Sequence, residues 1–288
     1  PVIESLHYEE VLKDKPLGTV VLITDPDHDR LTVCQIETVG AVPMLDEFGI
    51  SYIKLSEDRV LTVYTANQAF LMIMDFWAKS LKASGEFDKH TRFIVKTTPS
   101  SRSWDEWAHA NGIKAINTPV GFKEIANVIK KIEKQIEDGI QNIEITDIYG
   151  KVIELGKNPR MIFGGEESGG MILGAGELIT SISGRRALAM REKSASEAII
   201  ISSALVANLE YPLWQNLKNI YEENNIISKF DAREDISYYN ESEPNIEKLK
   251  EAKRVGEELR TKNDNFFLSL AIALEGKKIT LDNAKEIL

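Results

Sequence analysis

The sequence has a single cysteine, Cys34, among its 288 residues. No internal disulfide can form, and so little cysteine fits a reducing compartment, of which the cytoplasm is the default expectation. Positive charge is also scarce, because 35 lysine and arginine residues stand against 45 aspartate and glutamate residues and leave a formal net charge of −10. A protein that wraps nucleic acid needs a basic face, so nucleic acid is not an expected partner.

Long apolar runs are missing as well. The most apolar long stretch, residues 195–209, is interrupted by serines and a glutamate and is too short to span a bilayer, so it predicts a buried helix. No membrane partner is expected. The four histidines are scattered and form no metal-binding pattern, and no Gly-x-Ser-x-Gly segment marks a serine nucleophile.

What the sequence does contain is typical of a globular α/β protein. A content of 43% hydrophobic and 28% charged residues is ordinary, and the length allows two or three folding units. Thr65 followed by Gln68 matches a helix capping box, and apolar residues then recur at helical spacing as far as Leu81. From Arg92 onward strands and helices alternate, which indicates a parallel or mixed sheet covered by helices. In such sheets ligands bind beyond the carboxyl ends of the strands.

The chain after residue 194 is expected to be helical, with the polar stretch 231–244 as the best linker candidate. The expected strands are residues 19–23, 31–36, 50–55, 60–64, 93–96, 113–116 and 161–163. The expected helices, besides the one that follows Thr65, are residues 104–110, 122–137, 194–209, 213–224, 246–262, 264–274 and 282–288.

Three aspartates alternate in the segment that follows the first expected strand. Asp25, Asp27 and Asp29 would point the same way in extended backbone, so their carboxylates could converge on one hard cation. Arg30 would then lie beside an anion shared with that cation. An EF-hand is excluded, because its sixth and twelfth positions would hold Arg30 and Ile36 instead of Gly and Glu. Mg²⁺ with a phosphate co-ligand fits better than a closed Ca²⁺ cage, although spacing alone is equally compatible with an acidic, solvated turn.

A glycine-rich segment, residues 164–170, follows the last expected strand. Glu166 and Ser168 offer acceptors and donors suited to sugar hydroxyls, and the glycines let the backbone approach a ligand closely. A glycine-rich hairpin with solvated glutamates is the commoner structure for such a short pattern.

Further cations lie at the start of a helix and at a strand end. Arg191 and Lys193 precede Ser194, a plausible N-cap, so a phosphate site there competes with a salt-bridged surface turn. Lys96 lies at a strand end and could simply be solvated.

Taken in order, four segments resemble the α-D-phosphohexomutases, the phosphoglucomutase and phosphomannomutase family. They are residues 24–30 (Thr-Asp-Pro-Asp-His-Asp-Arg), 118–123 (Thr-Pro-Val-Gly-Phe-Lys), 165–169 (Gly-Glu-Glu-Ser-Gly) and 191–193 (Arg-Glu-Lys). The resemblance implies that residues 1–61 end the second domain of that family and carry the metal loop. It further implies that residues 62–209 form the third domain, and that residues 210–288 are a helical tail and linker toward a fourth.

The resemblance also implies roles for individual residues. Mg²⁺ would be held by Asp25, Asp27 and Asp29 against a phosphoserine of the first domain, whose oxygens Arg30 would bind. The hexose phosphate, or the hexose bisphosphate formed from it, would contact a second group of residues, with Lys96 assisting proton transfer. That group consists of Gly121, Glu166, Ser168, Arg191 and Lys193.

The chain departs from the family pattern in several places. Gly170 stands where some members carry a histidine, and Ser194 and Ala195 follow the Arg-Glu-Lys segment where others carry Asp-Gly. No Thr-Ala-Ser-His-Asn-Pro loop and no Arg-Pro-Ser-Gly-Thr loop occurs in the sequence. We therefore expect an internal fragment of a phosphohexomutase that is inactive alone and whose partners include the first and fourth domains of the same parent chain. The alternative is a non-catalytic α/β module that binds a metal or a sugar phosphate.

Overall fold

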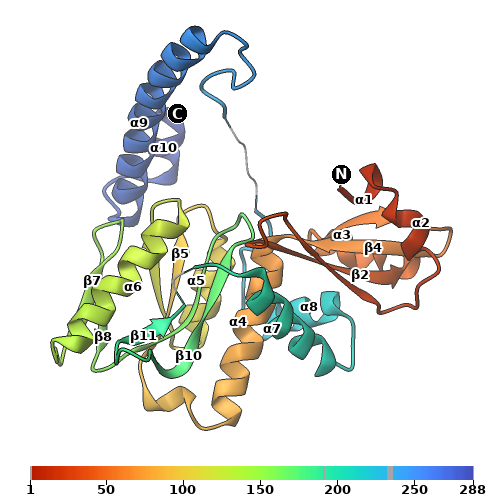
Figure 1. The fold of residues 1–288 in the computed structure, drawn as a ribbon, viewed down its shortest axis with the longest axis horizontal. Helices are drawn as coiled ribbons and strands as arrows, with labels where there is room; N and C mark the ends of the chain where they lie inside the picture. The colour runs from red at the N-terminus through yellow and green to blue at the C-terminus, as the bar shows by residue number, and fades with distance from the viewer. Residues whose placement is uncertain (1, 191, 232–235, 288) are drawn as a thin grey trace. The chain divides into compact units, whose positions relative to one another are not determined.

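A computed structural model describes residues 2–190, 192–231 and 236–287. The chain divides into two compact units, of which the first comprises Pro1–Ile145 and Val152–Asp231 and the second Thr146–Lys151 and Ala232–Leu288 (Figure 1). The candidate residues from the sequence that are described all belong to the first unit. The division into residues 1–61, 62–209 and 210–288 stays a prediction.

The N-terminal part of the first unit is a small antiparallel sheet, and the acidic loop connects its first two strands. Thr24 pairs with Leu31, so the acidic loop is the connection of a β-hairpin, beyond the last paired residues of its two strands. All four strands expected in this region are therefore present with bounds close to the predicted ones. Their order is β1-β2-β4-β3, and they are β1 (Val20–Thr24), β2 (Leu31–Thr38), β3 (Ser51–Lys54) and β4 (Arg59–Tyr64).

The two faces of this sheet contribute to different cores. Cys34 and Ile36 of β2 pack with Leu61 against the N-terminal helices, whereas Val33 and Tyr64 face the main core of the unit. Strand alternation explains the division, because neighbouring side chains point to opposite faces. The short helices of this region are α1 (Val2–Ser5), α2 (Tyr8–Leu12), η1 (Val39–Ala41) and α3 (Val42–Glu47).

The second sheet has the order β11-β10-β9-β5-β6. The strand pairs β5–β6 and β5–β9 are parallel, as the alternating sequence pattern predicts, and β10 and β11 extend the sheet in antiparallel fashion. No strand was expected after residue 163, so β10 and β11 are additions to the predicted fold. The strands are β5 (Arg92–Thr97), β6 (Lys114–Thr118), β9 (Arg160–Gly165), β10 (Met171–Thr180) and β11 (Arg186–Ala189).

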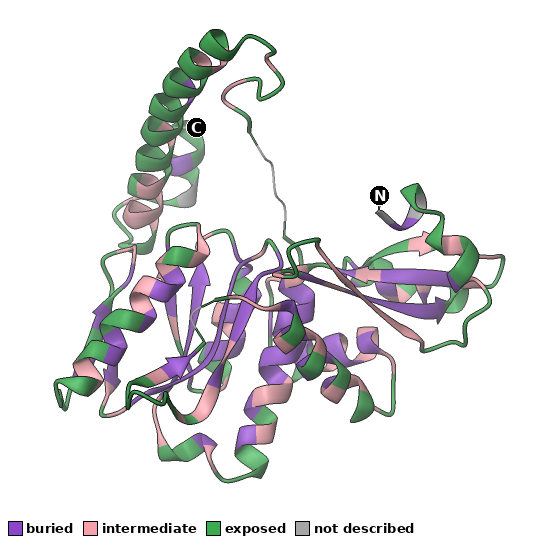
Figure 2. Cartoon of the chain, in the orientation of Figure 1, coloured by how far each residue is buried: buried purple, intermediate pink, exposed green. Residues whose placement is uncertain are grey.

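Helices cover both faces of this sheet, and its central strands are buried (Figure 2). Ile94 faces the core that holds α4 (Ala66–Ala83) and α5 (Arg102–Ala110), while Phe93 faces α6 (Phe122–Glu137). The capping box of α4 is confirmed, because the Gln68 N–H donates to Thr65 Oγ1 at 3.3 Å and the Thr65 N–H donates to Gln68 Oε1 at 3.1 Å. The predicted α/β class is therefore correct.

The remaining elements complete the two units. In the first, α7 (Ala195–Ala207) and α8 (Leu213–Glu223) pack on the main core, η2 (Phe87–Lys89) precedes β5, and β7 (Ile143–Thr146) pairs with β8 (Val152–Gly156). In the second, α9 (Ile246–Glu275) is followed by α10 (Leu281–Ile287). Among the described helices, none is long and apolar enough to cross a membrane.

One expectation for the C-terminal region changes. Residues 246–262 and 264–274 were predicted as separate helices, but α9 is continuous. A polar Lys-Asn-Asp sequence without glycine or proline therefore does not end a helix. Of the linker candidate 231–244, residues 232–235 lie outside the described part of the chain.

Glu37, near the end of β2, provides a test of buried charge. It is only 7% exposed, and burial raises its pKa from the ordinary 4.5 to about 6, although the Trp214 side chain opposes the rise. The folded state therefore holds this proton more tightly than the unfolded state. The associated stability is present below about pH 4.5 and is lost as the pH rises through about 6. At about 1.4 kcal/mol per pKa unit, the loss is about 2 kcal/mol.

We expect Glu37→Gln to be more stable than the parent at pH 7.5 by up to about 2 kcal/mol, with the difference shrinking toward pH 4.5. Urea unfolding followed by tryptophan fluorescence measures it. The control is Glu57→Gln, because the Glu57 side chain is fully exposed. This variant should have the stability of the parent at both pH 7.5 and pH 4.5. If Glu37→Gln and the parent differed in free energy of unfolding by the same amount at both pH values, burial of the Glu37 charge would not be the cause.

Candidate functional site

The acidic loop brings its three aspartates together. One carboxylate oxygen each of Asp25, Asp27 and Asp29 lies within 4.8 Å of the others. Asp25 Oδ1 accepts the N–H groups of Asp29 and Arg30, both at 3.0 Å, and so folds the loop back on itself. Partial burial acts to raise the pKa of Asp25, but the two N–H donors outweigh it and the pKa is lowered. The fold of the loop thus favours the ionised form of the Asp25 carboxylate.

The donor set fits a hard divalent cation. Three carboxylates at the end of a hairpin are the oxygen ligands that Mg²⁺ and Ca²⁺ take, with further positions left for water or a substrate oxygen. Asp29 Oδ1 is buried and accepts no hydrogen bond, and the cation that lies beside it in the structure is the Arg30 guanidinium. Arg30 Nε lies 3.6 Å from Asp25 and 3.5 Å from Asp29, so a guanidinium already balances part of this charge.

His28 fastens the acidic loop to helix α7. Its backbone is left-handed, with φ of 59°, and its carbonyl accepts the Ala195 N–H at 3.1 Å. The imidazole lies 3.2 Å from Thr24 Oγ1 and 3.0 Å from Ser196 Oγ. The residue at the predicted N-cap, Ser194, makes no side-chain capping bond, so His28 satisfies a backbone donor at the start of α7. No sequence pattern indicated this contact.

The glycine-rich segment is the turn between β9 and β10, where Gly165 pairs with Met171. It is therefore a hairpin, but Glu166 is only 6% exposed and not solvated. Glu166 Oε1 accepts the Gly121 N–H at 3.1 Å, and Ser168 Oγ lies 3.4 Å from Oε2. Burial raises the pKa of Glu166, and the nearby Lys193 opposes the rise.

Gly121 is needed for this arrangement. Its φ of 118° is a conformation that residues with a side chain rarely adopt. Its N–H is taken by Glu166 and its carbonyl accepts the Glu124 N–H at 2.9 Å. Both polar backbone groups of Gly121 are therefore engaged within the protein.

The carboxyl ends of the parallel strands meet at this loop. Lys96 of β5 is the register partner of Gly165, and the next residue, Thr97, donates its hydroxyl to Glu167 Oε2 at 2.9 Å. The sequence placed Thr97 at a strand end, where ligands of such sheets bind, and Glu167 in the glycine-rich segment, but no role was predicted for either.

Lys96 itself turns away from the loop. Its side chain is 2% exposed, and Nζ donates to the Ser101 carbonyl at 2.9 Å and pairs with Asp105. Burial lowers the pKa of Lys96, and Asp105 opposes that effect. Within the described part of the chain, no hydrogen bond or ion pair joins the Lys96 side chain to the other candidate residues.

One contact joins the acidic-loop hairpin to the glycine-rich loop, and a second joins the acidic loop to Lys193, which precedes α7. The Leu31 N–H donates to the Gly169 carbonyl at 3.1 Å, and Lys193 Nζ forms an ion pair with Asp29 Oδ2 at 2.8 Å. Lys193 Nζ also lies 5.9 Å from the centre of the Phe122 ring, which follows Gly121 in the chain. The positive charge of Lys193 acts to lower the pKa of Glu166. The candidate residues brought together in this way are Asp25, Asp27, Asp29, Arg30, Gly121, Glu166, Ser168 and Lys193. Arg191 lies outside the described residues.

Gly170 makes room for Lys193. A Cβ atom built on Gly170 would lie 2.6 Å from Lys193 Cδ. A larger residue at this position, such as the histidine of some phosphohexomutases, would displace the lysine from its place between the loops. The absence of a side chain at residue 170 is therefore matched to the position of Lys193.

Comparison with known proteins agrees with this architecture. Residues 67–200 match the family model described as phosphoglucomutase/phosphomannomutase, alpha/beta/alpha domain III. Among solved structures, one match is a protein from Thermus thermophilus provisionally named as a phosphomannomutase, with 18% identity and a TM-score of 0.40. That match covers 76% of this chain and 34% of the Thermus thermophilus protein. This chain therefore spans about a third of the length of that protein. No curated protein matches the chain. Residues 67–200 are therefore similar to the α/β/α domain III of the phosphoglucomutase and phosphomannomutase family.

Proposed function

We propose that this chain contributes the Mg²⁺-binding and sugar-binding parts of a phosphohexomutase. Such an enzyme interconverts hexose 1-phosphate and hexose 6-phosphate through a bisphosphate and an enzyme phosphoserine. The observation that carries the proposal is the ion pair between Asp29 and Lys193, because it joins the acidic loop to the residues that surround Glu166. In this proposal the two loops, with their separate chemistry, form one continuous site, as transfer of a phosphoryl group to and from a sugar requires.

In this proposal Asp25, Asp27 and Asp29 hold Mg²⁺. The ion would supply positive charge that neutralises a phosphoryl group in transfer. Arg30, whose side chain is 53% exposed, would bind phosphoryl oxygens through its guanidinium. Lys193 would face the substrate from the junction of the two loops, and Arg191, which lies outside the described residues, stays a predicted substrate contact.

Glu166 and Ser168 would hold the hydroxyls of the sugar. Glu166 Oε1 is committed to the Gly121 N–H, whereas the 3.4 Å separation of Oε2 from Ser168 is long for an O–H···O bond. Oε2 is thus the oxygen that can accept a sugar hydroxyl. Gly121 would act by fixing Glu166. Lys96 stays a predicted aid to proton transfer, although Asp105 and Ser101 enclose its ammonium group.

The test uses glucose 1,6-bisphosphate with Mg²⁺, and isothermal titration calorimetry measures its affinity for the chain. A hydrogen bond to a charged group contributes about 1.5–3 kcal/mol, so Glu166→Gln should weaken binding by about 10-fold or more. The matched control is Glu154→Gln on β8, an exposed residue, which should leave the affinity unchanged.

A second probe separates recognition of the sugar from recognition of phosphate. Hexane-1,6-diol bisphosphate has two phosphates but no ring hydroxyls, so it should bind the parent chain more weakly and be insensitive to Glu166→Gln. Equal binding of both probes by the parent, or unchanged sugar bisphosphate affinity in Glu166→Gln, would exclude the proposed role of the glycine-rich loop.

A further inference from the structure

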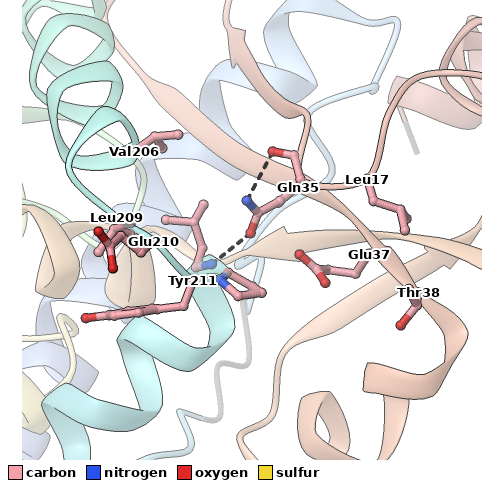
Figure 3. A pocket seen from close by; sticks show the side chains of 11 residues that line it. Leu17, Gln35, Glu37, Thr38, Val206, Leu209, Glu210 and Tyr211 are labelled. Atoms are coloured by element: carbon pink, nitrogen blue, oxygen red, sulfur yellow. Dashed lines mark hydrogen bonds between the residues drawn. The ribbon is translucent and has the colours of Figure 1, made fainter.

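A cavity separate from the candidate site lies in the first unit, where the end of β2 meets the segment between α7 and α8 (Figure 3). Its volume is about 380 Å³, which is room enough for a small organic molecule. None of the residues of the acidic loop or the glycine-rich loop lines it. Its occupant would therefore not compete with a substrate at those loops.

Hydrogen bonds from Gln35 hold the walls of the cavity in place. Gln35 Nε2 donates to the Gly18 carbonyl at 3.2 Å, and Gln35 Oε1 accepts the Leu213 N–H at 2.8 Å (Figure 3). Gln35 thus ties β2 both to the chain before β1 and to the start of α8. Because both ends of its amide are engaged, Gln35 shapes the cavity and leaves recognition to its neighbours.

Glu37 supplies the charge of the cavity. It lies two residues beyond Gln35 on the same face of β2, and its carboxylate points toward the segment that carries Tyr211 (Figure 3). It is 7% exposed, and no ion pair of Glu37 occurs within the described residues. Glu210 also lines the cavity, whereas no lysine, arginine or histidine does so. Burial raises the pKa of Glu37 only to about 6, so its carboxylate is ionised near neutral pH.

The rest of the lining is apolar or aromatic. Leu17 comes from the segment before β1, and Val206, Leu209 and Tyr211 come from the end of α7 and the residues after it. Aliphatic side chains and an aromatic ring suit the hydrocarbon body of a ligand, and an aromatic ring also attracts a cation. The complementary ligand therefore has an apolar body and one positive group.

We propose that this cavity binds a small organic amine, with its ammonium group on Glu37 and its hydrocarbon body against Val206, Leu209 and Tyr211. An ammonium group supplies the charge partner that the buried carboxylate lacks. A neutral or anionic molecule of the same shape supplies no positive charge to the Glu37 carboxylate.

Three probes of one shape test the charge requirement: phenethylamine, 2-phenylethanol and phenylacetate. Each is titrated into the ¹⁵N-labelled chain, and the shifts of the Trp214 indole N–H and the Leu213 amide are followed by NMR. Trp214 is placed beside Glu37, and its signal is assigned with Trp214→Phe. We expect the amine to bind at least about 10-fold more tightly than the alcohol and the anion to cause no shift.

Glu37→Gln provides the decisive comparison because it keeps the shape of the side chain. The variant should lose the roughly 10-fold preference for the amine and keep the affinity for the alcohol, while Glu57→Gln keeps both. Retained Mg²⁺ binding by Glu37→Gln shows that the variant is folded and that the cavity is independent of the acidic loop. An amine preference that survives Glu37→Gln, or an amine that binds no better than the alcohol to the parent chain, overturns the proposal.

Discussion

Replacing Asp27 by Asn is expected to weaken Mg²⁺ binding by about 100-fold while leaving the acidic loop folded. A hard cation depends on anionic oxygen ligands, and Asp27 would supply one of three carboxylates. Loss of a residue that only hydrogen-bonds to a metal ligand typically lowers metal affinity by about 10- to 100-fold, so loss of a ligand itself should cost at least as much. Isothermal titration calorimetry with Mg²⁺, repeated with Mn²⁺ by electron paramagnetic resonance, measures the change.

Asp27 is the most informative of the three aspartates. Asp25 accepts two backbone N–H groups, and Asp29 holds Lys193, so replacing either one would disturb the loop as well as the cation. Asp27 is exposed and has no comparable contact to the backbone or to a cation among the described residues. The control is Asp58→Asn, another exposed aspartate of the first unit, for which no change is expected. Equal Mg²⁺ affinity in Asp27→Asn and Asp58→Asn would remove Asp27 from the metal site.

Mg²⁺ binding should also stabilise the first unit, because a ligand that binds only the folded state adds to its stability. The parent chain should therefore unfold at a higher temperature with 10-fold excess Mg²⁺ over its dissociation constant, by an amount that corresponds to about 1.4 kcal/mol. Asp27→Asn at the same concentration should lose most of that gain.

The sequence predicted those elements whose signals are local. The capping box of Thr65 and Gln68 is local, and the start of α4 agrees with it. The acidic loop lies between two strands with clear apolar patterns, so its place at the end of a hairpin could be expected. By contrast, β10 contains glycine and a glutamate among its apolar residues and shows no alternation, so no strand was predicted there.

The assembly of the candidate site was less accessible from sequence. The ion pair of Asp29 with Lys193 and the contact of His28 with Ser196 join residues on separate elements, and no periodicity encodes them. Lys96 shows the same limit in the other direction. Its position at a strand end was correct, but the direction of its side chain depends on Asp105, which a neighbouring helix supplies.

Replacing Gly174 by Ala is expected to destabilise the first unit by about 3 kcal/mol or more. A Cβ atom on Gly174 would lie 1.8 Å from the Met161 carbonyl oxygen on the neighbouring strand β9. Backbone on both sides of this contact is fixed, because the Gly174 carbonyl also accepts the Trp77 indole N–H at 3.1 Å. Relief of the clash therefore requires β10 to separate from β9, which is the pair of strands that carries the glycine-rich loop.

Gly176 provides the matched control on the same strand. A Cβ atom there would meet only Leu81 Cδ2 at 3.7 Å, which is an ordinary contact, so Gly176→Ala should change stability by less than about 0.5 kcal/mol. Urea unfolding followed by tryptophan fluorescence reports on the first unit, because all four tryptophans belong to it. Since 1 kcal/mol shifts the melting temperature by about 2–4 °C at this size, Gly174→Ala should melt on the order of 10 °C lower. Similar stabilities for the two variants would show that β9 and β10 can separate without loss, and that the glycine-rich loop does not depend on their close approach.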